Sequence, residues 1–445
     1  MSVKSKRIHV IAIGGAIMHN LAIALSNRKY TVTGSDDAIY NPAKANLEKA
    51  GLYPKTIGWH ADSITTAIDF IILGMHARVN NPELIRAQEL GLSILSFPEF
   101  IALEAKEKKR IVVAGSHGKT TTTAMIMHVL SKRNRDFDYV VGSSIEGFDL
   151  SVKLSDAPLI IIEGDEYLTS PLDLRSKFLW YQPHVSIITG IAYDHINVFP
   201  TWELYVGTFK AFIETHRDDN KYFWYAGDET LAELSKNTTV TNEQYDTPKY
   251  VSDKSGTRLT LEGVQYTLNI VGKHNLENLR AAELVCSEIG ISQHEFYTAA
   301  ADFSGAGRRM EKIIENSKQV VYRDFAHSPS KLRATTAAIK ETYEGDLLAV
   351  FELHTFSSLT KDFLPHYIDS MNPADKAVVF FSEGVFEHKK MPSLSAEYVA
   401  ECFGDVDVIT DKNLLEEVVR KKYVAGANVL LMSSGTFSGA TLTWD

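Results

Sequence analysis

The chain has 445 residues, a formal net charge of −10 and two cysteines, Cys286 and Cys402. At about 100–200 residues per domain, this length predicts about three domains instead of one hydrophobic core. The acidic balance excludes a dedicated nucleic-acid binder, and two cysteines exclude a disulfide framework and a cysteine-rich metal site. No apolar run of about 18 residues occurs, so we expect no membrane span and a reducing, cytoplasmic setting.

Strand-like and helix-like segments alternate through the first hundred or so residues, which predicts a parallel sheet with helices packed on it. Ile13-Gly14-Gly15-Ala16 is similar to a dinucleotide-type turn, and Gly34-Ser35-Asp36 ends the next strand, where a carboxylate can contact a ribose or a base. The full G-x-G-x-x-G pattern is absent, because Ala12 and Ile17 stand where related loops carry glycine, so a plain structural turn is equally open. The expected segments are Ile8–Ile13, Met18–Leu25, Tyr30–Thr33, Ala43–Ala50, Phe70–Leu73, Pro82–Leu90 and Leu92–Leu95.

A charged stretch runs from Glu104 to Arg110, ahead of the next apolar strand. It is typical of the solvated end of a helix, and we expect its charges to need no partner. We place the first domain boundary here, between residues 1–107 and 108–307.

The stretch Gly115-Ser116-His117-Gly118-Lys119-Thr120-Thr121 lies between the apolar run Ile111–Ala114 and a helix-like segment. Strand, glycine-rich loop and helix together predict a phosphate-binding loop, in which backbone N–H groups and the helix N-terminus surround phosphate oxygens. Lys119 would neutralise the β- and γ-phosphates, and the Thr120 hydroxyl can bind Mg²⁺. Val113 replaces the first glycine of the full consensus, so the loop is a shortened variant; the alternative is a glycine-rich turn without a ligand.

Carboxylates and a histidine follow two further apolar strands. Glu163-Gly164-Asp165-Glu166 comes after Leu159–Ile162, which places carboxylates at the sheet edge beside the phosphate loop, where a metal-bound nucleotide needs them. Asp194-His195 follows Val185–Thr189 and is expected at the same edge, where His195 could bind a second Mg²⁺ or orient a phosphate. The alternatives are an acidic strand end facing solvent and a structural histidine.

Three more motifs lie further along the chain. Gly272-Lys273-His274-Asn275-Leu276-Glu277-Asn278 opens a helix, where Asn275 can cap the helix or, with His274, contact an adenine edge. Arg308-Arg309 offers a guanidinium that could clamp a phosphate. Asp324-Phe325-Ala326-His327-Ser328-Pro329 follows a strand, and Pro329 begins the next helix.

The remaining segments complete the domain assignment. Residues 238–255 are expected to form a polar insertion poor in strands. The third domain, residues 308–445, again alternates strands and helices, which predicts another parallel sheet. Its expected elements are Gln319–Tyr322, Ser330–Glu341, Leu347–Phe351, Ala377–Phe381 and Val429–Met432.

The order of these motifs, namely phosphate loop, E-x-D-E, D-H, G-x-H-N-x-x-N, R-R-x-E and D-F-A-H-x-P, resembles the Mur ligase family from end to end. The resemblance implies an ATP-dependent amide-bond-forming enzyme of peptidoglycan synthesis. It also implies an α/β fold of three domains: a Rossmann-like UDP-binding domain, a central ATPase domain of the phosphate-loop type, and a Rossmann-like acceptor-binding domain.

The resemblance also implies roles for single residues. Lys119, Glu163, His195 and His327 would be catalytic, with His327 in the acceptor site, and Thr120, Glu163 and His195 would hold Mg²⁺. Gly14, Gly15, Ser35 and Asp36 would bind the UDP-sugar. ATP would contact Gly115, Ser116, His117, Gly118, Lys119, Thr120, Thr121, His274, Asn275, Asn278, Arg309 and Asp324.

Within the family, residues 9–18 and 34–36 resemble members that take unsubstituted UDP-N-acetylmuramate. Two acceptors are known for that donor, and residues 163–169, 175–178, 194–200 and 432–439 are similar to the members that add L-alanyl-γ-D-glutamyl-meso-diaminopimelate in peptidoglycan recycling. The alternative acceptor is L-alanine. A different class, a nucleotide-gated binding protein that does not ligate, and a folylpolyglutamate synthetase are further alternatives; the latter has no UDP-binding domain.

The sequence departs from the family pattern at several positions. Gly190 and Ala192 replace the usual Asn and Glu before the Asp-His pair, and residues 352–361 fit neither acceptor pattern. Lys210 lies near a position where some relatives carry a carbamoylated lysine, but a solvated lysine is favoured. We expect a monomer or weak homodimer.

Overall fold

The computed structural model describes residues 6–217, 219–254, 256–305 and 309–444. The chain divides into two compact units. The first comprises residues 1–191, 203–244 and 284–289, and the second comprises residues 192–202, 245–283 and 290–445. The predicted second boundary, at residues 307 and 308, lies outside the described residues, as does Arg308; both predicted boundaries stay predictions.

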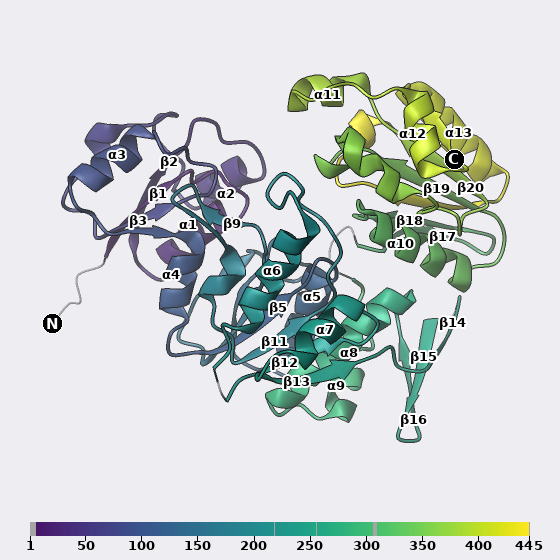
Figure 1. Ribbon diagram of the computed structural model, residues 1–445, viewed down its shortest axis with the longest axis horizontal. Helices are drawn as coiled ribbons and strands as arrows, with labels where there is room; N and C mark the ends of the chain where they lie inside the picture. The colour runs from purple at the N-terminus through teal and green to yellow at the C-terminus, as the bar shows by residue number, and fades with distance from the viewer. Residues whose placement is uncertain (1–5, 218, 255, 306–308, 445) are drawn as a thin grey trace. The chain divides into compact units, whose positions relative to one another are not determined.

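The N-terminal sheet has four parallel strands in the order β2-β1-β3-β4 (Figure 1). Four of the five residues of β1 are buried, as expected for an inner strand of a parallel sheet. The strands are β1 (Arg7–Ile11), β2 (Thr31–Ser35), β3 (Phe70–Leu73) and β4 (Ile94–Ser96). The helices are α1 (Met18–Asn27), α2 (Ala43–Lys49), α3 (Pro82–Glu89) and α4 (Phe97–Glu104), with a short 3₁₀ turn η1 (Ala61–Ser63).

The central sheet has seven strands in the order β13-β12-β11-β5-β8-β6-β7. β5 pairs in parallel with β11 on one side and β8 on the other, so the carboxyl ends of these three strands share one edge. The strands are β5 (Lys109–Ala114), β6 (Asp138–Val140), β7 (Val152–Lys153), β8 (Leu159–Glu163), β11 (Val185–Ile188), β12 (Lys221–Tyr225) and β13 (Thr241–Tyr245). The other elements are α5 (Lys119–Lys132), α6 (Trp202–Ile213), α7 (Glu229–Lys236), the 3₁₀ turn η2 (Lys177–Trp180) and an antiparallel hairpin of β9 (Leu168–Ser170) and β10 (Asp173–Ser176).

The charged stretch before β5 has buried partners, so the prediction that its charges need none is wrong. Lys108 is buried and its ammonium lies 2.9 Å from a carboxylate oxygen of the buried Asp138. Arg110 is also buried and donates to the Gln182 carbonyl at 2.9 Å. Glu104 accepts from Arg28 at 2.6 Å. The segment therefore connects the two sheets through buried polar contacts that local composition does not reveal.

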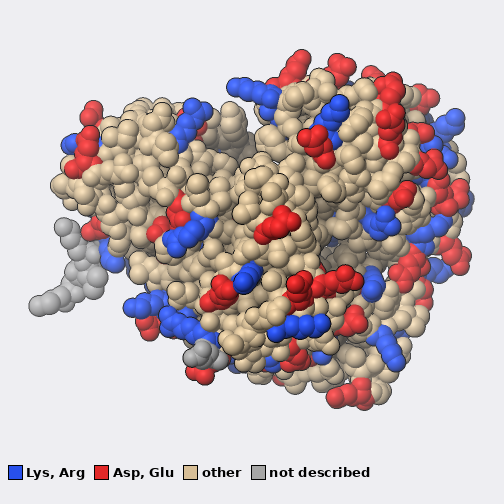
Figure 2. Space-filling model, in the orientation of Figure 1, with Lys and Arg blue, Asp and Glu red and all other residues tan. Residues whose placement is uncertain are grey.

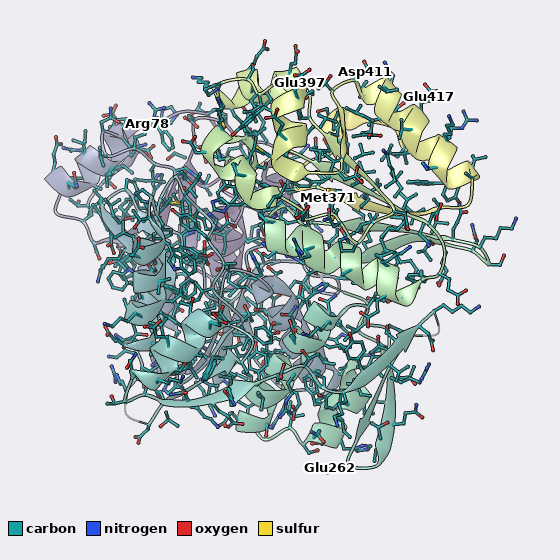
Figure 3. The ribbon with its side chains drawn as sticks, turned by 45° about the vertical axis from the view of Figure 1, so that its right-hand side comes forward. Arg78, Glu262, Met371, Glu397, Asp411 and Glu417 are labelled. Carbon is teal, nitrogen blue, oxygen red and sulfur yellow. The ribbon has the colours of Figure 1, made fainter. Side chains whose placement is uncertain are left out.

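The prediction that residues 238–255 are poor in strands is wrong, because β13 and a further strand, β14, lie within them. β14 (Tyr250–Asp253), β15 (Gly256–Leu261) and β16 (Val264–Leu268) form an antiparallel sheet. Glu262 and Gly263 form the β15–β16 turn, which lies at the tip of the hairpin in Figure 3. Both have positive φ angles, +50° and +82°, as a two-residue type I′ hairpin turn requires.

The C-terminal sheet has six strands in the order β17-β18-β22-β19-β20-β21, parallel except for β17. Alternate residues of β19 enter different cores: Ala349 and Phe351 pack on one face, and Leu348 and Val350 on the other. The buried Met371, labelled in Figure 3, belongs to the first of these cores. These observations confirm the α/β class and the parallel sheets predicted from the alternation of segments.

The elements of this region agree with the predicted segments to within a few residues. Its strands are β17 (Glu311–Glu315), β18 (Val320–Asp324), β19 (Leu347–Glu352), β20 (Lys376–Phe380), β21 (Asp407–Ile409) and β22 (Asn428–Met432). Its helices are α10 (Pro329–Thr342), α11 (Glu383–Lys389), α12 (Ala396–Phe403) and α13 (Lys412–Val424), with 3₁₀ turns η3 (Ser357–Leu359), η4 (Lys361–Tyr367) and η5 (Phe437–Gly439). Ahead of them lie α8 (Lys273–Glu288) and α9 (Gln293–Ala300).

Basic and acidic side chains are interspersed on the face drawn in Figure 2, with no continuous basic surface among the described residues there. Within the part of the chain that the structure describes, no helix is both long and apolar enough to cross a membrane.

Candidate active site

The predicted phosphate loop connects β5 to the N-terminus of α5. Gly115 has a φ of +122°, and a Cβ there would lie 2.7 Å from the Thr189 backbone nitrogen, so only glycine fits. Gly118, with a φ of +78°, is the residue that precedes α5. Thr189, directly after β11, donates its backbone N–H to the Ala114 carbonyl at 3.0 Å. Its hydroxyl lies within hydrogen-bond distance of the Ala114 and His117 carbonyls and can donate its single proton to either. The loop is therefore fixed to the neighbouring strand.

Lys119 begins α5, and its ammonium pairs with Glu166. The ammonium donates to Glu166 Oε2 at 2.7 Å and to the Gly115 carbonyl at 2.6 Å. Burial opposes the charge of the ammonium, but the nearby carboxylates of Glu166 and Asp165 outweigh it and raise the pKa of Lys119. The side chain is thus a fixed cation in the loop, as binding of phosphate oxygens requires.

Thr120 and Glu163 meet at the same edge. The Thr120 hydroxyl donates to Glu163 Oε1 at 2.7 Å, and the Gly142 amide donates to Glu163 Oε2 at 2.9 Å. Hydroxyl and carboxylate oxygens are the ligands that Mg²⁺ prefers, and Mg²⁺ usually takes only one or two protein oxygens besides water and nucleotide phosphates. The pair therefore fits a phosphate-bound Mg²⁺. Among the described residues, no three His, Cys, Asp or Glu side chains gather into a metal cluster.

Asp165 and Lys177 form a second ion pair beside the first. The Lys177 ammonium donates to Asp165 Oδ2 at 2.6 Å. Burial disfavours the ionised carboxyl, but Lys177 and Lys119 lower the pKa of Asp165 well below its usual range. The charges of Lys177, Asp165, Lys119 and Glu166 thus alternate in sign at the carboxyl edge of β8.

The predicted site lacks three residues that contact it in the structure: Glu166, Thr189 and Tyr205, whose hydroxyl oxygen lies 2.7 Å from Ser116 Oγ. Glu166 stood within the recognised acidic motif, which was a usable signal, but its pairing with Lys119 joins positions 47 residues apart. Thr189 and Tyr205 had no local signal.

Asp194 and His195 lie in the second unit. The Asp194 carboxylate accepts from the His195 backbone N–H at 2.7 Å and from the Ser357 hydroxyl at 3.4 Å. Although burial opposes ionisation, His195, Lys331 and His327 hold the pKa of Asp194 well below its usual range. The role of His195 as a metal ligand stays a prediction.

His327 follows β18 in the second unit. Its Nδ1 lies 2.8 Å from the Phe325 carbonyl, a contact in which Nδ1 must carry the proton. Burial, reinforced by Lys331, lowers the pKa of His327 to about 3. The ring is thus neutral at pH 7, with Nε2 as a hydrogen-bond acceptor.

The residues of the second unit that were predicted to bind the nucleotide make hydrogen bonds to nearby residues of their own helix and its start. Asn275 is buried and donates to the Val271 carbonyl at 2.9 Å, and Asn278 donates to Asn275 at 3.5 Å. His274, next to Asn275 in α8, has its pKa lowered by burial. The motif begins a helix as predicted, but Asn275 is the third residue of α8 and its side chain donates instead of accepting, so it is not the N-cap. Contact with adenine stays a prediction.

Asp324 is the last residue of β18, and Arg309 lies just before β17 in the chain. The buried Asp324 carboxylate accepts from the Met310 and Ala326 amides at 2.6 and 2.7 Å. The Arg309 guanidinium lies over the Phe325 ring, 5.4 Å from its centroid. Stacking of this kind orients the guanidinium plane.

In the N-terminal sheet, the predicted sugar-binding residues contact one another. The Gly14 amide donates to Asp36 Oδ2 at 2.7 Å, which joins the loop after β1 to the end of β2. The Gly15 amide turns back to the Ala12 carbonyl at 3.3 Å. Burial raises the pKa of Asp36, and the hydrogen bond from Gly14 only partly offsets this.

Ser35 donates to Glu83, a fully buried carboxylate at the start of α3. Glu83 also accepts from the His60 amide at 2.7 Å and lies 3.3 Å from His9 Nε2. Burial disfavours ionisation, but the hydrogen bonds from His9, His60 and Ser35 lower the pKa of Glu83.

A cavity of about 320 Å³ opens where the carboxyl ends of β3 and β4 face the β9–β10 hairpin. Its walls combine carboxylates, a guanidinium, hydroxyls and aliphatic side chains, which suits a polar organic ligand. The lining residues are Leu73, Ile94, Ser96, Glu99, Ser170, Leu172, Asp173 and Arg175.

Glu352 closes the carboxyl end of β19 in the C-terminal sheet. It is buried and accepts from the Ser433 hydroxyl and from the Phe437 and Ser438 amides, the latter at 2.8 and 3.1 Å. Next to it, burial lowers the pKa of His354. The loop after β22 is thus anchored by a buried carboxylate.

The central sheet carries a phosphate loop with two acidic partners at its carboxyl edge, and further α/β sheets precede and follow it in the chain. This combination defines a multidomain nucleotide-dependent α/β enzyme. Family models match most of the chain: residues 7–109 match the Mur ligase family catalytic domain, 113–286 the Mur ligase middle domain, and 308–435 the Mur ligase glutamate ligase domain. The chain belongs to the Mur ligase family. It is an ATP-dependent acid–amino acid ligase that acts on peptidoglycan precursors.

Two relatives illustrate the similarity. The UDP-N-acetylmuramate–L-alanine ligase of Carboxydothermus hydrogenoformans is 30% identical over 414 residues, covering 89% of this chain and 86% of the relative. The UDP-N-acetylmuramate–L-alanyl-gamma-D-glutamyl-meso-2,6-diaminoheptandioate ligase of Escherichia coli is 27% identical over 450 residues, covering 97% and 96%.

Solved structures share the fold. A murein peptide ligase from Psychrobacter arcticus superposes with a TM-score of 0.67 at 23% identity, covering 99% of this chain and 98% of that one. The UDP-N-acetylmuramate–alanine ligase of Thermotoga maritima gives a TM-score of 0.71 at 21% identity, covering 98% and 97%. Both comparisons support the three-domain architecture predicted from the sequence.

Proposed function

We propose that this enzyme joins the lactoyl carboxylate of UDP-N-acetylmuramate to the amine of L-alanyl-γ-D-glutamyl-meso-diaminopimelate, in peptidoglycan recycling. The observation that carries the ligase chemistry is the Lys119, Thr120 and Glu163 arrangement at the carboxyl edge of the central sheet. The tripeptide acceptor is supported by the motif resemblance and by the near-complete coverage of the Escherichia coli relative.

The donor would occupy the first unit. Gly14, Gly15, Ser35 and Asp36 form the carboxyl edge of the N-terminal sheet, the usual place for a nucleotide in such a fold. The cavity between that sheet and the β9–β10 hairpin offers Arg175 and hydroxyl groups to a sugar.

In the first chemical step, the donor carboxylate attacks the γ-phosphorus of ATP, the bond between that phosphorus and the β-γ bridging oxygen breaks, and an acyl phosphate and ADP form. Charge spreads over the equatorial phosphate oxygens, and Lys119 with the N-terminus of α5 would stabilise it. Thr120 and Glu163 would hold Mg²⁺, which neutralises phosphate charge when bound. His195 is proposed as a further ligand.

In the second step, the amine attacks the acyl carbon and phosphate leaves. His327 is neutral and presents Nε2 as an acceptor, so it would orient the amine N–H; its low pKa makes it a weak base. His274, Asn275, Asn278, Arg309 and Asp324 are proposed to contact the nucleotide.

The second candidate is ligation of L-alanine, favoured by the 30% identity to an L-alanine ligase. The deciding experiment supplies ATP, Mg²⁺ and UDP-N-acetylmuramate, offers tripeptide and L-alanine in separate reactions, and identifies products by mass. We expect the tripeptide adduct. Ligation of L-alanine alone would overturn the acceptor assignment.

A second measurement, of phosphate release, distinguishes a ligase from a nucleotide-gated binding protein that does not ligate. A ligase releases phosphate only with donor and amine together, whereas a switch would hydrolyse ATP without either.

A further inference from the structure

The Tyr205 hydroxyl connects helix α6 to the phosphate loop. The Tyr205 side chain is fully buried, and its hydroxyl oxygen lies 2.7 Å from Ser116 Oγ in the loop. The same hydroxyl donates to Glu166 Oε1 at 3.3 Å. The other oxygen of Glu166 accepts from Lys119. A continuous polar chain thus runs from Ser116 through Tyr205 and Glu166 to Lys119.

The direction of this chain follows from proton counting. The ionised Glu166 carboxylate can only accept, and a phenol has one proton to give. Because Tyr205 gives that proton to Glu166, the Ser116 hydroxyl must donate to Tyr205. The Ser116 backbone N–H donates to the Gly190 carbonyl at 2.9 Å. Both donors of Ser116 are therefore used inside the protein, and this residue anchors the loop.

The Tyr205 ring is held by aromatic packing along the inner face of α6. It meets Phe209 edge-on at 5.4 Å between centroids, and Phe209 meets Phe178 edge-on at 5.6 Å. Phe178 stacks on Phe212 at 4.5 Å. Removing the hydroxyl would leave this packing intact, so a phenylalanine substitution isolates the polar role.

We propose that Tyr205 is a positioning residue for ATP binding. Its hydroxyl fixes one oxygen of Glu166, which keeps the other oxygen directed at Lys119 and holds the ammonium in the phosphate loop. Without that bond the carboxylate is less restrained, and the ammonium loses one of its two fixed partners while keeping the Gly115 carbonyl. This inference rests on the proposed role of Lys119 in binding the triphosphate.

The test compares Tyr205→Phe with Tyr222→Phe. Tyr222 lies on β12, and its buried hydroxyl donates to Ser235 of α7 at 2.9 Å, so this control also removes a buried hydroxyl. ATP and adenosine are titrated by calorimetry without donor or acceptor. We expect Tyr205→Phe to weaken ATP binding about tenfold, as expected for a lost hydrogen bond to a charged group, and to change adenosine binding by less than about twofold. Tyr222→Phe should leave both affinities unchanged.

Ser116→Ala cuts the same chain from its other end and provides the test if Tyr205→Phe does not fold. We expect it to weaken ATP binding about threefold, and the double variant to lose less than the product of the two single effects, because the residues act together. Unaltered ATP affinity in Tyr205→Phe, or equal losses of ATP and adenosine, would overturn the inference.

The variant Lys119→Ala distinguishes failure of the proposed role of Lys119 from failure of the proposed role of Tyr205. If it retains full ATP affinity, the proposed role of Lys119 fails. If it loses ATP affinity and Tyr205→Phe does not, only the role of Tyr205 fails.

Discussion

The carboxyl edges of the central and N-terminal sheets both carry buried carboxylates, but these carboxylates have different partners. In the central sheet, Glu166 pairs with the Lys119 ammonium and Glu163 with the Thr120 hydroxyl. In the N-terminal sheet, Asp36 accepts from the Gly14 amide and Glu83 from the His60 amide.

The difference separates two uses of the same residue type. A carboxylate bonded to backbone amides fixes the path of a loop, as Glu352 also does in the C-terminal sheet. At the central edge, the Lys119 ammonium and the Thr120 hydroxyl are phosphate-loop groups that can exchange a carboxylate for a phosphate or a metal ion. The hydroxyl partners of Glu83 and Glu352, from Ser35 and Ser433, lie outside a phosphate loop. The comparison predicts that substitutions at the central edge impair catalysis and that substitutions of amide-bonded carboxylates impair stability.

The largest expected effect comes from Lys119→Ala. Removal of the fixed cation should lower kcat/KM for ATP about 10³-fold, because an electrostatic contact to the transferring phosphoryl group is lost. Donor binding, measured by calorimetry with UDP-N-acetylmuramate, should stay within about twofold. Loss of donor binding as well would show that the two edges are not independent.

Glu163→Gln should lower kcat about 10²-fold and raise the Mg²⁺ concentration needed for half-maximal rate, because a neutral amide is a poor ligand for a hard cation. Steady-state rates across a Mg²⁺ titration measure both. Glu203→Gln, on the exposed start of α6, serves as the control. An unchanged Mg²⁺ dependence would remove Glu163 from the metal site.

Glu352→Ala should destabilise the C-terminal region by about 2 kcal/mol, because two amides and a hydroxyl lose a buried charged acceptor. Thermal unfolding of the variant and of Glu383→Ala, an exposed residue of α11, tests this. Equal midpoints for the two variants would contradict an anchoring role for Glu352.

The smallest effect is expected for Asp165→Asn. The folded-state pKa of Asp165 lies below its unfolded value, so its ionised form contributes stability above about pH 4 that is lost as the pH falls further. The carboxylate is 39% exposed, so the loss at pH 7 should be only about 0.5–1 kcal/mol. The thermal midpoints of the wild type and of Asp165→Asn should therefore lie closer together at about pH 3 than at pH 7.

The pKa of Asp36 is shifted in the opposite direction from that of Asp165, so the variant Asp36→Asn provides a companion test. Its pKa is raised, so its ionisation costs stability as the pH rises above the ordinary aspartate range. The loss of stability of Asp36→Asn relative to the wild type should therefore be smallest at neutral pH. A larger loss for Asp36→Asn at pH 7 than at low pH would contradict this assignment.

Much of the fold could be predicted from the sequence because parallel strands buried on both faces form apolar runs, such as Leu159–Ile162 and Leu347–Phe351. The β14–β16 sheet was missed because its strands are rich in polar residues and one face is exposed. The motifs located Lys119, Thr120 and Glu163 on one sheet edge. They could not reveal that Glu166 pairs with Lys119 or that Tyr205 contacts Ser116, because such pairs depend on tertiary contacts between distant positions.

The ion pair between Lys108 and Asp138 has a consequence for dividing this chain into separately produced pieces. A truncated protein that starts after residue 110 would leave Asp138 as a buried charge without its ammonium partner, a loss of several kcal/mol for a buried pair. The cut that best preserves autonomous folding of the central sheet therefore lies ahead of Lys108.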